Sequence, residues 1–336
     1  MIIDAHAHFV PRALLDQLAS GRHGFSSVQA SVESGGIRVS FSGMDPKRPV
    51  MAEMSDVDRR RAWLNQRGID KQIVGGWLDL FGYDLPAAEG ADWSRYLNDH
   101  MLRATRDIPF FVPLATVPMQ SGTHAAAVLS EALDAGCHGA MIGTQPKGAS
   151  GVLDDADLDP FWQIASDRQA TLFVHPTFGV RDDRLKAYGL VSAIGRLTDT
   201  MISIARLLYS GHLSRYPGVS LVISHGGATL PMALGRMRRS FATNPAKNSD
   251  PLEGFNRLYF DSVVYDPSVL RFVCDLAGAD KVLMGTDEPF IIAEQEPVQF
   301  VKSCGFDGAA EASILGDTAA RLFKIAPDAV HARNQG

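Results

Sequence analysis

The chain has 336 residues, of which 46% are hydrophobic and 21% are charged. This balance is typical of a globular protein with a substantial core and argues against a disordered chain. The formal net charge is −6 and the Lys and Arg residues are scattered, so we expect neither nucleic acid nor a membrane surface as a partner. The three cysteines are far apart and form no CxxC pair, which argues against a thiolate zinc site and a disulfide framework.

The N-terminal sequence MIIDAHAHF lacks the basic start and long apolar run of a signal peptide. No apolar run elsewhere reaches membrane-spanning length, so a cytoplasmic location is the expectation. The length falls in the range of α/β barrels with insertions, and one domain over residues 1–336 is therefore expected.

Eight short apolar runs alternate with longer amphipathic stretches, which is typical of strand-helix repeats around a parallel sheet. The predicted strands cover residues 1–6, 71–75, 110–116, 139–142, 171–175, 220–225, 258–262 and 281–287. The predicted helices between them include residues 53–66, 124–135, 157–168, 229–241 and 267–277. Eight such repeats predict an α/β fold of the closed (β/α)₈ or TIM-barrel type.

The segment from about residue 9 to residue 50 does not fit this repeat. It has Gly-Gly, Ser-Gly and Pro signals around short alternating runs such as residues 36–41. We expect an inserted, hairpin-like lid after the first strand. Residues 326–336 lack periodicity and are predicted to be a loose C-terminal tail.

Five polar side chains fall at the carboxyl ends of predicted strands. His6 and His8 lie two residues apart in an extended run, so both imidazoles point to the same face. His175, His225 and Asp287 each end an apolar run, in TLFVH, LVISH and VLMGTD. Active sites of barrels lie at this rim, so the sequence predicts one site built from all five.

Three histidines and one carboxylate suit a divalent metal ion and leave a coordination position open. We expect His6, His8, His175 and Asp287 to hold it, with zinc as the first expectation and manganese as the alternative. His225 suits proton transfer because an imidazole titrates close to neutral pH, although Asp287 could take the role of base instead. Asp261 is either an acceptor that orients a histidine or a plain turn residue.

The chain resembles the amidohydrolase superfamily, in the branch typified by aminocarboxymuconate semialdehyde decarboxylase. The resemblance rests on the motifs IDAHAHF, KRPV, RGIDKQIV, FGYD, VPLATVPMQ, FVHPTFG, ISHGG, LGR, FDS and VLMGTDEPF. It implies a distorted barrel, a single metal at the four predicted ligands, His225 as the catalytic histidine and non-oxidative decarboxylation. Relatives with two metals carry a bridging lysine where this chain has Gly143 and Thr144, so a second metal is not expected.

The resemblance also implies residues that contact a carboxylate substrate. Arg48 in the lid and Arg236 match family arginines, and a guanidinium group suits an anion. An arginine like Arg236 lies near a dimer interface in the family, so a homodimer is expected. Four aromatic residues could form a wall for a planar substrate, or they could simply pack in the core. They are Trp77, Phe81, Phe178 and Phe290.

Two positions depart from the family pattern. Thr177 and then Phe178 follow the His-Pro pair where several relatives have an aromatic residue at once. Glu288 follows Asp287 where an aromatic residue is common, and it could repel anions or act as an extra acid in the substrate site. The expected substrate is an aromatic (hydroxybenzoate-like) or ring-cleavage-derived unsaturated carboxylic acid. A metal-dependent hydrolase or hydratase, and an inactive metal-binding scaffold, are the alternatives.

Overall fold

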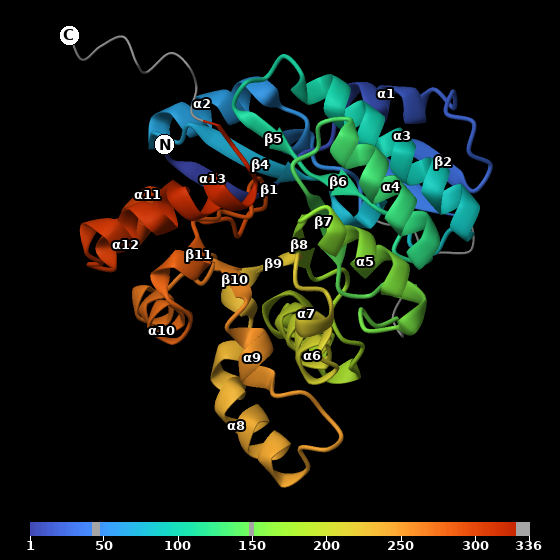
Figure 1. Ribbon diagram of the computed structural model, residues 1–336. Coiled ribbons are helices and arrows are strands. Elements are labelled where there is room, and N and C mark those ends of the chain that lie inside the picture. The colour runs from blue at the N-terminus through green and yellow to red at the C-terminus, as the bar shows by residue number, and fades with distance from the viewer. Residues whose placement is uncertain (42–47, 148–150, 327–336) are drawn as a thin grey trace.

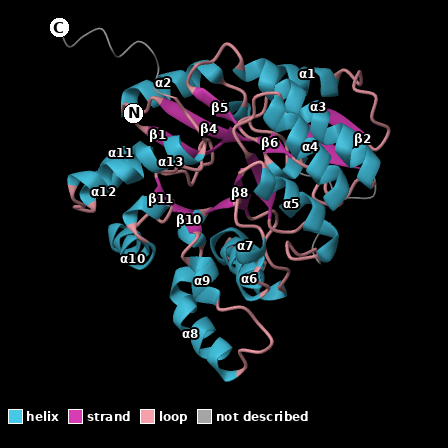
Figure 2. Cartoon of the chain, viewed as in Figure 1, coloured by secondary structure: helices cyan, strands magenta, loops and turns pink. Residues whose placement is uncertain are grey.

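The computed structural model describes residues 1–41, 48–147 and 151–326. Parallel strands form its centre and helices surround them (Figure 1 and Figure 2). The hydrogen-bonded order is β1-β4-β5 in one sheet and β11-β10-β9-β8-β7-β6 in the other. These strands are β1 (Ile3–His8), β4 (Lys71–Gly75), β5 (Phe111–Pro113), β6 (Ala115–Thr116), β7 (Ala140–Gly143), β8 (Thr171–His175), β9 (Ser220–Ile223), β10 (Leu258–Asp261) and β11 (Val282–Leu283).

Backbone hydrogen bonds join the first and last strands of this series. Ala5 N donates to Met284 O at 2.8 Å, and Ala7 pairs in parallel with Glu288. At the other junction, Leu114 N donates to Val74 O at 2.9 Å. The strands therefore form a distorted ring, which confirms the predicted (β/α)₈ barrel.

The helices between the strands cover the outside of the ring (Figure 1). They are α1 (Arg12–Ala19), α2 (Val57–Arg67), α3 (Ala87–Thr105), α4 (Gly122–Asp134), α5 (Asp159–Asp167), α6 (Arg196–Tyr209), α7 (His212–Arg215), α8 (Leu230–Thr243), α9 (Pro251–Phe255), α10 (Pro267–Ala277), α11 (Pro297–Ser303), α12 (Gly308–Ala312) and α13 (Thr318–Leu322). Helix α8 extends away from the strands, at the lower edge of Figure 1.

Local sequence signals explain where several helices begin and end. The Asp56 side chain accepts a hydrogen bond from Arg59 N at the start of α2, and Gly68 ends that helix with a left-handed φ of 65°. Asp266 caps α10 in the same way, and Pro267 occupies its first turn. These signals are legible in the sequence, and the predicted helix over residues 267–277 matches α10.

The segment after β1 contains helix α1 and the antiparallel hairpin of β2 (Val28–Glu33) and β3 (Gly36–Phe41). The hairpin was expected from the sequence, whereas α1 was not. Val28, Val39 and Phe41 pack with Trp77 and Trp93, so the hairpin is attached to the loop after β4 and to α3. Residues 42–47 of the expected lid and residues 327–336 of the expected tail lie outside the described residues.

The predicted eighth strand over residues 281–287 was too long. Only Val282–Leu283 forms a strand, because the chain then turns toward the site and Asp287 has a left-handed φ of 66°. The first strand, by contrast, extends to His8 and includes both histidines.

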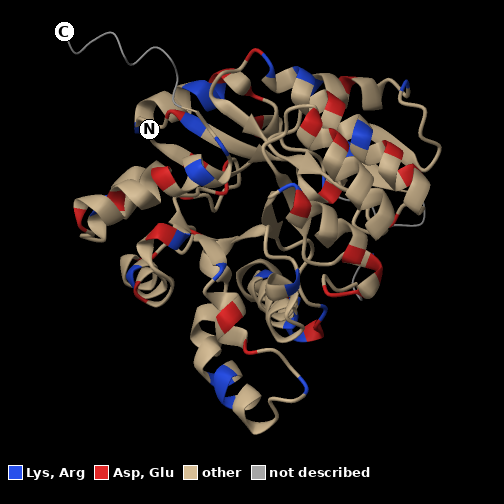
Figure 3. Cartoon of the chain, viewed as in Figure 1, with Lys and Arg blue, Asp and Glu red and all other residues tan. Residues whose placement is uncertain are grey.

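The charge and cysteine patterns also follow the sequence. Acidic and basic residues are interspersed along the helices (Figure 3). All three cysteines are free and buried. In the part of the chain that the structure describes, none of the helices combines the length and apolar character needed to cross a membrane.

Candidate metal centre

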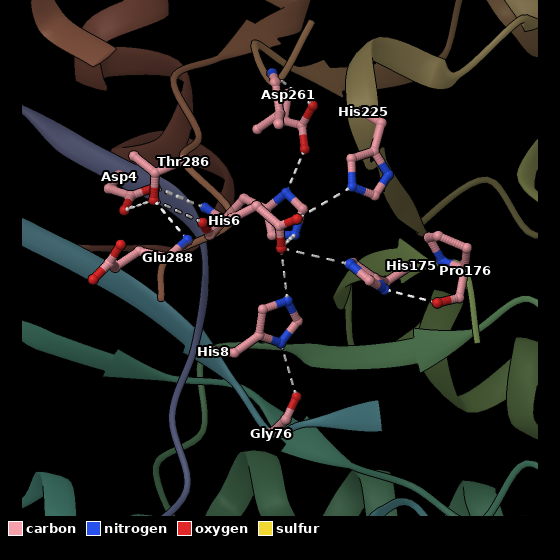
Figure 4. Close-up of polar contacts among 12 residues, drawn as sticks. Asp4, His6, His8, Gly76, His175, Pro176, His225, Asp261, Thr286 and Glu288 are labelled. Atoms are coloured by element: carbon pink, nitrogen blue, oxygen red, sulfur yellow. Dashed lines mark hydrogen bonds and ion pairs between the residues drawn. The ribbon is translucent and has the colours of Figure 1, made fainter. Parts of the chain in front are cut away.

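Four imidazoles face one another at the carboxyl end of the barrel (Figure 4). His6 and His8 belong to β1, His175 ends β8 and His225 follows β9. The Asp287 carboxylate lies among them: its Oδ1 is 3.3 Å from His6 Nε2 and 3.2 Å from His8 Nε2. It is 3.9 Å from His175 Nε2, and Oδ2 is 3.6 Å from His225 Nε2. The structure therefore brings all five predicted residues together.

Three of the imidazoles are fixed from behind through Nδ1. His6 Nδ1 lies 2.6 Å from Asp261 Oδ2, and His8 Nδ1 lies 3.1 Å from the Gly76 carbonyl oxygen. His175 Nδ1 lies 2.9 Å from its neighbouring backbone oxygen, on Pro176. Each of these oxygens can only accept, so Nδ1 donates and each Nε2 faces the centre.

This arrangement fits a divalent cation. His6 Nε2 and His175 Nε2 are buried, and neither has a hydrogen-bond partner among the described residues. Buried polar atoms without partners are uncommon in proteins, and a bound ion can satisfy them. Imidazole nitrogens with one carboxylate oxygen are a ligand set for zinc and comparable metals.

His225 differs from the other three imidazoles. Its Nδ1 is buried but has no hydrogen-bond partner among the residues that the structure describes. Its Nε2 faces Asp287, and its side chain lines a cavity at the mouth of the barrel. Among the described residues no acceptor holds Nδ1 of this ring, and its Nε2 lies 3.6 Å from Asp287 Oδ2. His225 is therefore the imidazole that lies beside the cavity and is not held from behind.

The backbone around His225 is held in an uncommon conformation. His225 has a left-handed φ of 57°, as does the following Gly226 with 62°. A Cβ atom on Gly226 would lie 2.3 Å from Val264 Cγ1, so only glycine fits there. Asp261 Oδ1 accepts from Gly226 N at 2.8 Å and so fixes this turn. Strained backbone of this kind concentrates at functional sites.

The site is electrostatically coupled. Burial by itself lowers the pKa of His6, but the Asp287 and Asp261 carboxylates outweigh burial and raise that pKa to about 10. Burial lowers the pKa of His8 and holds the pKa of His175 well below its usual value. Burial alone would raise the pKa of Asp287, but His6 and the neighbouring imidazoles hold it well below its ordinary value. The charges on His6 and Asp287 therefore stabilise each other.

A cavity of about 650 Å³ opens above the centre and is lined by His225 and Asp287. Its other walls come from the segment before and at the start of α6, from the loop after β10 and from the loop after β11. They include Ser192, Ala193, Arg196, Leu197, Val263, Val264, Tyr265 and Ile292. This volume is in the range of small-molecule sites.

The predicted aromatic wall is not part of this cavity lining. Trp77 is buried, and the Arg48 guanidinium lies 5.2 Å from its ring centroid. The Phe290 ring packs against His8 with centroids 5.2 Å apart, while Phe178 lines a separate, smaller pocket beside Asp79. Phe81 is buried and lines the same smaller pocket as Phe178. A contact between these rings and a substrate stays a prediction.

Glu288 corrects a sequence expectation. Its carboxylate is buried, with Arg59 Nη1 2.6 Å from Oε1 and Arg60 Nε 3.9 Å away, and Glu288 is not among the residues that line the cavity. In Figure 4 the carboxylate points away from the imidazoles. It is therefore not placed to contact a substrate. Arg236, on the exposed part of α8, does not line the cavity of its own chain either.

Tyr265 and Arg196 are cavity residues that the sequence analysis did not single out. Tyr265 follows β10 with a left-handed φ of 59°, and its place after a barrel strand was a usable signal. Arg196 begins α6, within a helix, where no motif marks it. Arg48, which the sequence did indicate, is exposed and lies 3.5 Å from Asp79.

Comparisons with known proteins find similar sequences and similar folds. A 2-amino-3-carboxymuconate-6-semialdehyde decarboxylase from Dictyostelium discoideum is 29% identical over 289 residues, covering 84% of this chain and 80% of the relative. The structure of a 5-carboxyvanillate decarboxylase from Sphingomonas paucimobilis aligns with a TM-score of 0.80 at 23% identity, over 97% of this chain and 99% of that one. A dihydroxybenzoic acid decarboxylase from Polaromonas sp. JS666, solved with bound manganese and the inhibitor 2-nitroresorcinol, aligns with a TM-score of 0.78 at 19% identity over 96% of each chain.

These structural likenesses confirm the barrel fold. The sequence pattern of the amidohydrolase family matches residues 3–325, a range that holds the whole barrel and all five residues of the centre. The chain belongs to the amidohydrolase family.

Proposed function

We propose that the protein is a metal-dependent decarboxylase that releases carbon dioxide from an aromatic or ring-cleavage-derived unsaturated carboxylic acid. The observation that carries this proposal is the difference between His225 and the other imidazoles. Nδ1 of three rings contacts an acceptor, whereas Nδ1 of His225 has no hydrogen-bond partner among the described residues and the His225 side chain lines the cavity. The relatives named above are decarboxylases, which supports the reaction class.

In this proposal, His6, His8, His175 and Asp287 hold one divalent metal, zinc or manganese. When bound, the metal supplies a fixed positive charge that draws in an anionic substrate and stabilises negative charge on its oxygens. The manganese in the Polaromonas structure makes that metal as strong a candidate as zinc. The four side chains are buried, so their positions need little further ordering on binding.

His225 serves as the general acid. Its Nε2 delivers a proton to the substrate carbon that carries the carboxylate group. The bond from that carbon to the carboxylate then breaks, its electron pair returns to the conjugated system, and carbon dioxide leaves. A positioned side chain of this kind contributes about 10²- to 10⁴-fold to a rate. No oxidant is required.

Arg48 is proposed to help recruit the anionic substrate. It is exposed, lies beside Trp77 and is only loosely paired with Asp79 at 3.5 Å. A guanidinium with a weak partner can exchange that partner for a substrate carboxylate.

A homodimer is the proposed assembly, with Arg236 reaching toward the cavity of a second copy. Large apolar side chains are exposed just before and on α6, on α8 and in the loop after β11: Ile194, Ile202, Met232, Ile291 and Ile292. Exposed apolar surface is common at protein interfaces. Light scattering of the purified protein measures its mass in solution, and Met232→Glu should weaken the dimer. A wild-type protein that is monomeric, with a mass that Met232→Glu leaves unchanged, would contradict the proposal.

The reaction is tested with metal-loaded protein, candidate hydroxybenzoates and muconate semialdehydes. We expect one molecule of carbon dioxide to be released for each molecule of substrate consumed, and no water to be added to the product. A His225→Asn variant serves as the inactive control. Turnover by hydrolysis or water addition without carbon dioxide would overturn the decarboxylase proposal in favour of the hydrolase or hydratase alternative.

A further inference from the structure

Arg196 lines the same cavity as His225 and Asp287 but belongs to a different wall. It is the first residue of α6, next to Ser192 and Ala193 of the preceding turn. The Asp287 carboxylate is close enough to influence it electrostatically, as is Arg48 from the lid. The cavity is thus lined by His225 and Asp287 of the centre and by the Arg196 side chain.

The Arg196 guanidinium is poorly compensated. It is half-buried, and its Nε is buried without a hydrogen-bond partner. Within the described ranges, no carboxylate lies at ion-pair distance from it. The buried Arg60 guanidinium also has an Nε without a hydrogen-bond partner, but Glu288 lies 3.9 Å from that Nε, and its Nη1 and Nη2 donate to Gln72 Oε1 and the His8 carbonyl oxygen. Burial lowers the pKa of Arg196 and Arg48 lowers it further, while Asp79 and Asp287 offset only part of this. Charged groups in such surroundings are normally paired.

The backbone that carries Arg196 is firmly held. Val180 N donates to Gly195 O at 3.1 Å, which ties the start of α6 to the loop after β8. Asp199, one turn further along, accepts from Gln145 Nε2 at 2.9 Å and from the Thr144 hydroxyl. The guanidinium therefore projects from a fixed platform, and its orientation toward the cavity does not depend on a loose loop.

We propose that Arg196 binds a second acidic group of the substrate, so that the enzyme selects aromatic or unsaturated acids carrying two carboxylates. This inference rests on the proposed decarboxylase function and adds the substrate class. One carboxylate would lie at the His/Asp centre beside His225, and the other would pair with Arg196 on the side wall. A cavity of about 650 Å³ has room for a substituted ring between them.

Turnover tests the selection directly. The substrates are 2-hydroxybenzoate and two analogues with one more carboxylate, 2-hydroxybenzene-1,3-dicarboxylate and 4-hydroxybenzene-1,3-dicarboxylate. For wild type we expect at least one diacid to have the higher kcat/KM. Arg196→Gln should lower kcat/KM for that diacid about 10- to 100-fold, mainly through KM, and should change the monoacid less than about threefold. Arg196→Lys should recover part of the loss.

Arg206→Gln is the matched control, because Arg206 lies on the same helix but pairs with Asp154 on the outer surface. It should leave the preference for diacids unchanged. Arg196→Met should also unfold at a temperature equal to or above that of wild type, because it removes a poorly compensated charge. A marked loss of stability would instead assign Arg196 a structural role and overturn the proposal.

Binding separates this inference from the reaction itself. Calorimetry with benzene-1,3-dicarboxylate and benzoate, neither of which carries an activating hydroxyl, needs no turnover. Tighter binding of the diacid that Arg196→Gln abolishes supports the inference even if no carbon dioxide is ever released. Equal losses for the monoacid and the diacid would mean that Arg196 binds the reacting carboxylate, and the second-acid proposal would fail while the decarboxylase proposal stood.

Discussion

The Asp261 carboxylate accepts a hydrogen bond from His6 Nδ1 at 2.6 Å, and both side chains are fully buried. Its other oxygen accepts from Gly226 N at 2.8 Å and from Val263 N at 3.1 Å. One residue thus orients an expected metal ligand and fixes the turn that presents His225. The sequence left Asp261 between an orienting acceptor and a plain turn residue, and the structure shows both roles.

Substitution of Asp261 should therefore weaken metal binding, although Asp261 is not one of the expected metal ligands. In Asp261→Asn the side chain keeps its size but loses its charge, so His6 is oriented less strongly. Partners of this kind are worth about 10- to 100-fold in metal affinity. Competition with a chelator measures the effect. Thr171→Ser is the control, because Thr171 is buried at the start of β8, at the other end of the strand from His175. Unchanged metal affinity in Asp261→Asn would contradict the orienting role of Asp261.

Metal uptake should depend on pH because His6 must lose its proton. In the metal-free protein, the pKa of His6 is raised to about 10, so at pH 7 its imidazole is protonated. A cation at Nε2 displaces that proton, so apparent affinity should rise with pH, by up to tenfold per unit below pH 10. Calorimetry of Mn²⁺ binding in buffers of different ionisation enthalpy should report about one proton released. Uptake without proton release would refute this charge state.

The barrel and the five central residues were predictable because their signals are local. An apolar run that ends in a polar residue marks both a buried strand and the rim at which it ends, as in TLFVH before Pro176. Arg196 and Glu288 were not predictable in this way. The direction of Glu288 depends on Arg59, 229 positions away in the chain, and the cavity position of Arg196 depends on how α6 packs. Such contacts exist only after folding.

The glycine after His225 should not tolerate a side chain. Gly226→Ala would place a methyl group against Val264 in a backbone with φ of 62°. We expect a loss of about 2 kcal/mol in unfolding free energy, from the strain and the clash together. Gly235→Ala, in α8 where a Cβ meets open space, should be neutral or slightly stabilising. Thermal unfolding of both variants decides, and equal stability would contradict the argument.

His225→Asn should separate metal binding from catalysis. We expect metal content close to that of wild type, because the other three imidazoles and Asp287 remain, and a rate reduced at least about 10²-fold. Elemental analysis and carbon dioxide release are the two measurements. His138→Asn, a histidine at the opposite end of the barrel whose Nδ1 contacts Phe323 O, should retain activity. Loss of the metal in His225→Asn would instead make His225 a ligand, a role that its place within 4.8 Å of the other donors allows.

Glu288 should matter for stability rather than for substrate recognition. Its carboxylate is 1% exposed and is shared between Arg59 at 2.6 Å and the equally buried Arg60 at 3.9 Å. Glu288→Gln removes the charge that compensates Arg60, and breaking a buried pair in this way costs about 3 kcal/mol. Glu296→Gln is the control. The Glu296 side chain is largely exposed, so its ion pair with Arg67 should contribute less than about 1 kcal/mol. Denaturant unfolding compares the two variants. A Glu288→Gln protein of wild-type stability but altered KM would restore the substrate-site role that the sequence suggested.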